Sequence, residues 1–267
     1  MKNTAYHPSL TNLAKYSTYT DYLLEYTKHK DWKSIKDSLK YVLFKTPPTT
    51  DRIITSKMGT FWCRGNTNDF QYVNYAYEKQ VKNYIYKNRK QYDFFIDIGA
   101  CMGEYCIWLA KAGMPSIAFE PVPSNFKALS KNVELNQMQQ MVTVLPVGLG
   151  SKAEKVYFDI KPVLTSASGI DRSYQGPETN VEIKRFDDLL PELPCTPEHR
   201  VIMKLDVEGM EVEVLQGAAD FIKKARGLAL VMEKTFSGED NIRNFLASLG
   251  TFVYEDIDEV NMVAIKQ

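Results

Sequence analysis

Acidic residues at the ends of apolar runs are the groups in this chain that could do chemistry. The segment FFIDIGACMGEY (94–105) is an apolar run that ends at Asp97 and turns through Gly99 and Gly103. Gly99 permits a sharp turn, and Gly103 would let the backbone approach a ligand closely. The spacing departs from the Gly-x-Gly-x-x-Gly fingerprint of dinucleotide sites, because position 101 is cysteine. The aspartate would repel a phosphate, so we expect a turn that binds a small cationic molecule rather than a dinucleotide.

A second acid follows the next apolar run, in AFEPVPSNF (118–126). Glu120 lies about 20 residues after the glycine turn, where an acid can hold a ribose diol. A cationic amino-acid end and a ribose occur together in S-adenosylmethionine, so the two acids suit that ligand. The alternative is that Asp97 and Glu120 are solvated carboxylates at strand ends.

A third acidic group follows another apolar run, in VIMKLDVEGMEVEVLQGA (201–218). Asp206 and Glu208 come where this run ends and a helix begins near Met210. Acids there complement the dipole of the helix, which gives part of the group a structural explanation. Ligands bind beyond the carboxyl ends of parallel strands, so Asp206 should face the same crevice as Asp97.

Glu233 ends the following run, in LVMEK, and should lie beside Asp206. Convergent carboxylates indicate a general base or a site for a divalent cation. The alternative is that Glu233 pairs with Lys234 or with another neighbouring base.

Short apolar runs alternate with amphipathic helical patterns after Arg89, which predicts βαβ units and a mainly parallel sheet. The predicted strands are 94–98, 116–119, 142–147, 201–205, 228–232, 251–254 and 262–265. The predicted helices include the apolar positions of 126–133, 214–222 and 242–249.

Residues 152–200 interrupt this rhythm and predict a β-hairpin-like insertion. Its strand-like stretches, KVYFDI and VEIKRF, flank a loop over 165–179. The loop residues that could contact a sugar are Ser166, Ser168, Asp171, Arg172 and Tyr174. Long loops in compact domains are often functional, but a solvated surface loop is the alternative.

Residues 1–50 predict a helical appendage before the main domain of 51–267. Asp31 should cap a helix in which apolar residues recur at helical spacing until Pro47 and Pro48 end it. Two short strands around Gly59 and a helix over 70–86 should lead into the core of 93–267. We expect the aromatic residues of the appendage to form a helical core, with a cover for the site or a dimer contact as alternatives: Tyr16, Tyr19, Tyr22, Tyr26 and Trp32.

Composition excludes some classes of function. Lys+Arg and Asp+Glu both number 33, which argues against a nucleic-acid partner held mainly through its phosphates. The 4 cysteines form no Cys-x-x-Cys pair and the 3 histidines lie far apart, so we expect no structural zinc. No apolar stretch approaches the ~20 residues of a membrane span, and the N-terminus lacks the apolar core of a signal peptide. We expect a soluble protein of the cytoplasm.

Together these stretches resemble the FkbM family of S-adenosylmethionine-dependent methyltransferases, from about Gly59 to Lys266. The motifs that carry the resemblance are FIDIGACMGEY, AFEPVPSNFKALSKNVELN, VEIKRFDDLL, IMKLDVEGMEVEVLQGA and LVMEK. The resemblance implies a Rossmann-like class I methyltransferase fold, an α/β sheet of seven strands whose last strand is antiparallel, with helices on both faces.

The resemblance also implies roles for individual residues. The cofactor S-adenosyl-L-methionine should contact Asp97, Gly99, Ala100, Gly103, Glu104, Tyr105, Glu120, Pro121, Asn125 and Asp206. Asp206 and Glu208 match the family's signature segment and are the candidates for the catalytic base. Met210 stands where many members carry histidine; if that histidine is a catalytic base in them, this chain would need another. By analogy with catechol-type enzymes, Asp206 and Glu233 could hold a divalent cation.

The predicted function is therefore O-methylation of a hydroxyl on a sugar, glycan or related small natural product. The acceptor would be a small molecule or a saccharide, and a homodimer is one option for the assembly. The alternative is a catalytically inactive protein that binds S-adenosylmethionine, or a scaffold, which interacts through its N-terminal helices.

Overall fold

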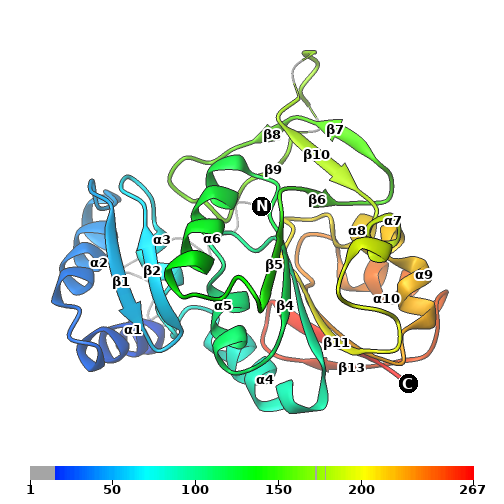
Figure 1. The fold of residues 1–267 in the computed structure, drawn as a ribbon. Helices are drawn as coiled ribbons and strands as arrows, with labels where there is room; N and C mark the ends of the chain where they lie inside the picture. Colours follow the sequence, from blue (N-terminus) through cyan, green and yellow to red (C-terminus); the bar gives the residue numbers. More distant parts are fainter. Residues whose placement is uncertain (1–15, 172, 178) are drawn as a thin grey trace.

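A seven-stranded sheet forms the centre of the molecule in the computed structural model, which describes residues 16–171, 173–177 and 179–267 (Figure 1). Its strands are β3 (Phe94–Ile98), β4 (Ser116–Phe119), β5 (Val142–Leu145), β11 (Arg200–Leu205), β12 (Gly227–Glu233), β13 (Phe252–Asp256) and β14 (Asn261–Lys266). Their order is β13-β14-β12-β11-β3-β4-β5, and β14 runs antiparallel to both of its neighbours, whereas the other pairings are parallel. The predicted Rossmann-like, mainly parallel sheet is confirmed.

Helices cover both faces of this sheet. The first face carries α4 (Lys79–Asn88), α5 (Glu104–Lys111) and α6 (Pro123–Leu135), and the second carries α7 (Phe186–Leu189), α8 (Glu211–Gly217), α9 (Ala219–Lys224) and α10 (Glu239–Ala247). Successive strand residues point to opposite faces, so Phe95 is buried in the first core and Ile96 in the second. This two-sided burial explains why the strands read as continuous apolar runs.

The N-terminal third consists of two helices and a hairpin: α1 (Tyr16–Lys28), α2 (Trp32–Phe44), β1 (Arg52–Ser56) and β2 (Gly59–Cys63). The Asp31 carboxylate accepts the backbone N–H of Ser34 at 3.0 Å and caps α2, as its sequence predicts. Tyr26 and Tyr41 are buried in the same core as β2 and α5, so these helices pack onto the main domain. The part of the appendage before Tyr16 lies outside the described residues.

The helix predicted over 70–86 is wrong in its middle. The structure has α3 (Asp69–Tyr72) and α4, separated by a buried turn over 73–78. The Asn74 side chain accepts the N–H of Ala76 at 2.8 Å, which competes with the helical pattern. The buried Lys82 ammonium donates to the carbonyl of Tyr77, another backbone group of the turn. The amphipathic spacing of the segment contains no signal for these polar contacts.

The insertion and the two residues of β6 that precede it form two small sheets. A three-stranded sheet contains β6 (Gly148–Leu149), β10 (Val181–Lys184) and β7 (Glu154–Val156), and a two-stranded sheet contains β8 (Phe158–Asp159) and β9 (Gly169–Ile170). The pairing of β7 with β10 is antiparallel, as a hairpin-like insertion requires, and β10 also pairs in parallel with β6. In Figure 1 this unit lies at the top of the view, beyond the upper ends of β4 and β5. Short 3₁₀ turns over Arg89–Gln91 and Leu190–Glu192 complete the connections.

No helix in the described ranges has the length and apolar character that crossing a bilayer requires.

Asn132 of α6 joins three parts of the fold and provides a test of it. It is fully buried, accepts the N–H of Trp62 at 2.7 Å and donates to the carbonyl of Met102 at 3.0 Å. Replacing it with alanine leaves both backbone groups unpaired, so Asn132→Ala should lower the free energy of unfolding by roughly 2–4 kcal/mol. Urea titration followed by circular dichroism measures this. Asn244→Ala, at an exposed position of α10, is the control and should change stability by less than about 0.5 kcal/mol; equal losses would contradict the role of Asn132.

Candidate functional site

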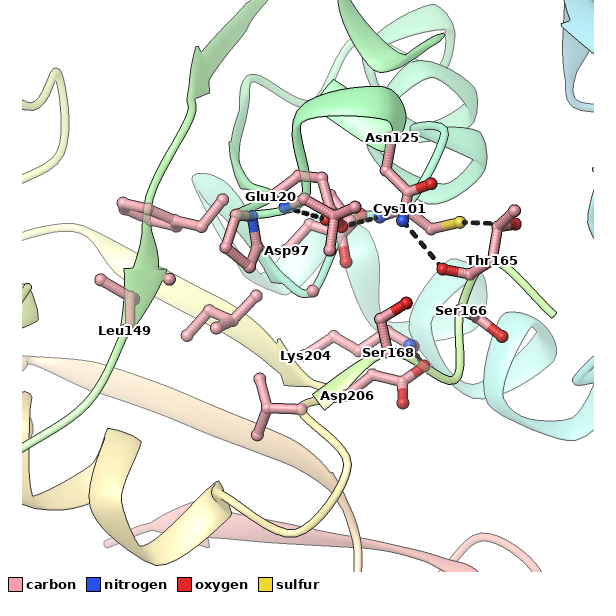
Figure 2. A pocket seen from close by; sticks show the side chains of 18 of the residues that line it. Asp97, Cys101, Glu120, Asn125, Leu149, Thr165, Ser166, Ser168, Lys204 and Asp206 are labelled. Atoms are coloured by element: carbon pink, nitrogen blue, oxygen red, sulfur yellow. Dashed lines mark hydrogen bonds and ion pairs between the residues drawn. The ribbon is translucent and has the colours of Figure 1, made fainter. Parts of the chain in front are cut away.

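A cavity of about 790 Å³, which includes some open solvent, lies at the carboxyl ends of β3, β4 and β11. Figure 2 shows how its side chains converge from these strands, from α6 and from the insertion. Its lining includes nearly all of the residues predicted to contact a cofactor: Asp97, Gly99, Ala100, Glu104, Tyr105, Glu120, Pro121, Asn125 and Asp206.

Gly103 does not line the cavity, and the expectation that it lets the backbone approach a ligand is wrong. A Cβ at this position would stand 2.4 Å from Cδ1 of Leu129, so the missing side chain makes room for α6 rather than for a ligand. Gly99 is needed because two parts of the backbone approach each other closely at this position. A Cβ there would meet the backbone carbonyl oxygen of Asp206 at 2.0 Å, and its φ of +87° also favours glycine. The turn after β3 thereby packs directly against the end of β11.

Glu120 is held by two backbone groups beside this turn. One carboxylate oxygen accepts the N–H of Cys101 at 2.8 Å, and the other accepts the N–H of Val122 at 2.8 Å. Its side chain is almost fully buried, and burial raises its pKa to about 7. Each carboxylate oxygen has a second lone pair, so the fixed side chain can still accept hydrogen bonds from a ligand in the cavity.

Lys204 is a site residue that the sequence analysis missed. It faces Asp97 across the pairing of β11 with β3, and its ammonium lies 2.8 Å from Oδ2 of Asp206 and 3.8 Å from Oε2 of Glu78. Burial alone would lower the pKa of Lys204, but Asp206 and the other carboxylates raise it above its ordinary value. The alternation of side chains along β11 could have indicated it, because Lys204 is a charged residue inside an apolar run two positions before Asp206.

Asp97 and Glu104 are also buried acids in the lining. Burial raises the pKa of Asp97 to about 7, opposed by the charge of Lys204. Burial likewise raises the pKa of Glu104, opposed by the charge of Lys82, whose own pKa burial lowers. Oε2 of Glu104 is buried and has no hydrogen-bond partner among the described residues. It is an acceptor at the cavity wall that a ligand could satisfy.

The turn after β2 supports the cavity from behind its lining, through hydrogen bonds that the sequence analysis missed. Arg64 donates three bonds to Asp69, two from its side chain and one from its backbone N–H, and a fourth at 2.9 Å to Asn125 of α6. Asp69 in turn accepts the hydroxyl of Thr165, in the insertion loop, at 3.0 Å. Tyr72 shares a hydrogen bond of 2.7 Å with Ser166. Segments about 100 residues apart are thus joined at the cavity, a pairing that local sequence patterns do not contain.

The acids after β11 occupy different places. Asp206 lines the cavity, whereas Glu208 does not, and lies beside Gly169 of the insertion. Burial, followed by repulsion from Asp206, raises the pKa of Glu208 to about 8. Glu211 accepts the hydroxyl of Ser237. No group of three histidine, cysteine or acidic side chains in the described part of the chain is arranged to hold a metal ion, so the cation suggested for Asp206 and Glu233 has no support from this geometry.

Only some of the insertion-loop residues that were expected to contact a sugar line the cavity. Ser166 and Ser168 line the cavity. Tyr174 stacks on Tyr157 with ring centroids 4.0 Å apart, and Asp171 accepts hydrogen bonds from Ser173. Arg172 lies outside the described residues.

Comparison with known proteins places this arrangement in a family. The model of the methyltransferase FkbM domain matches residues 97–254, more than half of the chain. The chain belongs to the FkbM methyltransferase family. The matched range contains Asp97, Glu120, Asp206 and the insertion, so the cavity of this FkbM methyltransferase is built largely from the domain that defines the family.

Named relatives are similar over the same part of the chain. Methyltransferase 1 of Beauveria bassiana (strain ARSEF 2860) is 27% identical over 187 residues, which cover 58% of this chain and 74% of the relative. The hexuronic acid methyltransferase AglP of Haloferax volcanii is 31% identical over 150 residues, covering 55% of this chain and 58% of AglP. Among solved structures, a methyltransferase FkbM from Methylobacillus flagellatus KT has a TM-score of 0.47 at 17% identity, over 66% of this chain and 44% of that one.

The pKa of Asp97 gives a prediction for the ligand-free FkbM methyltransferase. Its ordinary value is 3.8 and its value in the fold is about 7, so the folded state keeps a proton in this window that the unfolded chain has lost. The free energy of unfolding should therefore fall as the pH rises from about 4 to about 7. Glu104 and Glu120 contribute in the same direction. Asp97→Asn cannot lose this proton, so its stability should fall less steeply than that of the unchanged protein in urea titrations across this range.

The exposed Glu255→Gln is the matched control and should keep the original slope. An unchanged slope in Asp97→Asn would show that Asp97 does not carry a raised pKa.

Proposed function

We propose that this protein is an S-adenosylmethionine-dependent O-methyltransferase that acts on a hydroxyl group of a sugar, glycan or related small natural product. The observation that carries the proposal is one cavity, in a member of a methyltransferase family, that gathers Asp97 and Glu120 at the ends of adjacent strands and Glu104 at the start of α5. A ligand with both a cationic end and a ribose would satisfy these acids together.

The residues present fit S-adenosylmethionine. Glu120 is fixed where an acid of a Rossmann-like sheet holds a ribose diol, and its carboxylate has more lone pairs than the two that accept backbone N–H groups. Glu104 offers a buried oxygen without a partner in the described part of the chain, and Asp97 lies beside it. We assign these two acids to the α-ammonium and sulfonium charges. Such charges would also favour the ionised forms of both acids, which burial alone opposes.

The cofactor supplies an activated methyl group; this chain must align the acceptor and remove its proton. We assign the general base to Asp206, because it is the acid of the family's signature segment that lines the cavity; Lys204, 2.8 Å away, holds its carboxylate in place. Asp206 would take the proton of the acceptor hydroxyl as that oxygen receives the methyl group. Glu208 lies at the edge, toward the insertion, where it would orient the acceptor.

The insertion supplies the polar groups for an acceptor. Ser166 and Ser168 line the cavity on the side that the insertion loop provides, as Figure 2 shows. Hydroxyl side chains both donate and accept hydrogen bonds, which suits a polyhydroxylated molecule. The name of the Haloferax relative, a hexuronic acid methyltransferase, supports a saccharide as the acceptor.

If Asp206 is the base, Asp206→Asn and Glu208→Gln should have different effects on kcat and on KM for the acceptor. With a panel of uronic acids and neutral glycosides as acceptors, S-adenosylhomocysteine release measures turnover. Asp206→Asn should lower kcat by roughly 10²–10⁴-fold, because the carboxylate assigned to accept the hydroxyl proton is then absent. Glu208→Gln should raise KM for the acceptor and leave kcat within about tenfold.

Binding of S-adenosylhomocysteine to each variant is the control for folding and should be retained. Full turnover in Asp206→Asn would exclude it as the base. If Glu208→Gln alone abolished turnover, and the wild-type kcat rose with an apparent pKa of about 8, Glu208 would be the base instead.

A further inference from the structure

The outer face of α2 exposes large apolar side chains in an amphipathic pattern. Trp32, Leu39 and Leu43 are 64%, 55% and 55% exposed, and Phe44 is 71% exposed. The first three recur at intervals of seven and four residues, so they form one stripe along the helix. Exposed apolar groups that are contiguous mark a site of interaction. The expectation that Trp32 packs in a helical core is therefore wrong.

The fold does not need this stripe for its own packing. The opposite side of α2 buries Ser34 and Tyr41 and packs Ile35 against the core. Figure 1 shows α2 at the outer edge of the molecule, with the β1–β2 hairpin between it and the central sheet. One side of α2 therefore packs on the protein, and the side with the apolar stripe is exposed to solvent.

The charges around the stripe are of one sign. Residues 28–45 contain six lysines and two aspartates, a local excess of four positive charges in a chain whose net charge is +0. The two aspartates, Asp31 and Asp37, are turned toward Arg52, whose guanidinium nitrogens lie 3.6 and 3.1 Å from their carboxylates. Lys36 and Lys40 are exposed within one helical turn of the apolar stripe.

We infer that α2 docks this protein on a membrane surface that contains anionic lipid. A helix that carries tryptophan and leucine beside lysines lies in the interface plane, with its apolar side chains among the acyl chains and its lysines at the headgroups. Charge complementarity favours this occupant over a second copy of the same face, since a symmetric contact would oppose two positive surfaces. The inference does not depend on the proposed methyl transfer.

Vesicle flotation tests the inference with the full chain. Vesicles of phosphatidylcholine with about one third phosphatidylglycerol should bind the protein, and binding should weaken as salt is raised, whereas pure phosphatidylcholine should bind at least tenfold less. Trp32 should move to a less polar environment, so the fluorescence emission should shift to the blue on anionic vesicles. The Trp32→Phe variant should lose the shift, because Trp108 is buried and Trp62 is half-buried.

Two sets of substitutions separate the apolar and charged contributions. Each lysine near an anionic surface is worth about fivefold in binding, so Lys33→Gln, Lys36→Gln and Lys40→Gln together should weaken it by roughly 100-fold. Leu39→Ser and Leu43→Ser together should weaken binding to the same vesicles by at least tenfold. The matched control changes Lys111, Lys127 and Lys224, exposed lysines outside residues 28–45, to glutamine and should keep most of the binding.

Thermal unfolding checks that each variant is folded. Failure to bind anionic vesicles would overturn the inference, as would an equal loss in the control set. A concentration-dependent mass in the absence of lipid, abolished by the leucine substitutions, would assign this face to a second copy of the chain and would also overturn it.

Discussion

The candidate site depends on the burial of carboxylates at the ends of parallel strands. Burying an acid without compensation opposes its ionisation, and the pKa values of Asp97, Glu104 and Glu120 are all raised for this reason. The fold compensates only in part, through the charges of Lys82 and Lys204 and through two backbone N–H groups at Glu120. A site of this kind gains most from a ligand that brings positive charge and hydroxyl donors. The cofactor that we propose has both.

Several distant segments hold this arrangement in place. Gly99 allows the turn after β3 to reach the backbone of β11, and Arg64 links the lead-in turn to α6 and, through Asp69, to the insertion. The N-terminal helices are connected to these segments as well, because the Tyr26 hydroxyl of α1 donates to the carbonyl of Phe70 in α3 at 3.3 Å. The cavity is therefore a product of the family domain together with the chain that precedes the matched range. A surface on α2 that binds lipid would be fixed rigidly to one wall of the site.

The sequence predicts the central sheet well, because strands buried on both faces leave uninterrupted apolar runs and ligands gather at their carboxyl ends. It locates Asp97, Glu120 and Asp206 for the same reason. The break between α3 and α4 and the role of Arg64 are not predictable in this way, since both arise from polar contacts between segments far apart in the chain. Gly103 shows a further limit. A glycine beside a ligand turn suggests close approach to the ligand, but only the structure reveals that its neighbour is Leu129.

The central claim is that this cavity binds S-adenosylmethionine through its buried acids. Isothermal titration with S-adenosylhomocysteine tests it without knowledge of the acceptor. The account predicts saturable binding by the unchanged protein and by Glu255→Gln, and binding at least tenfold weaker in Glu120→Ala, which loses charged hydrogen-bond acceptors for the ribose. Absence of heat and of any thermal shift with the unchanged protein, or full affinity in Glu120→Ala, would contradict it.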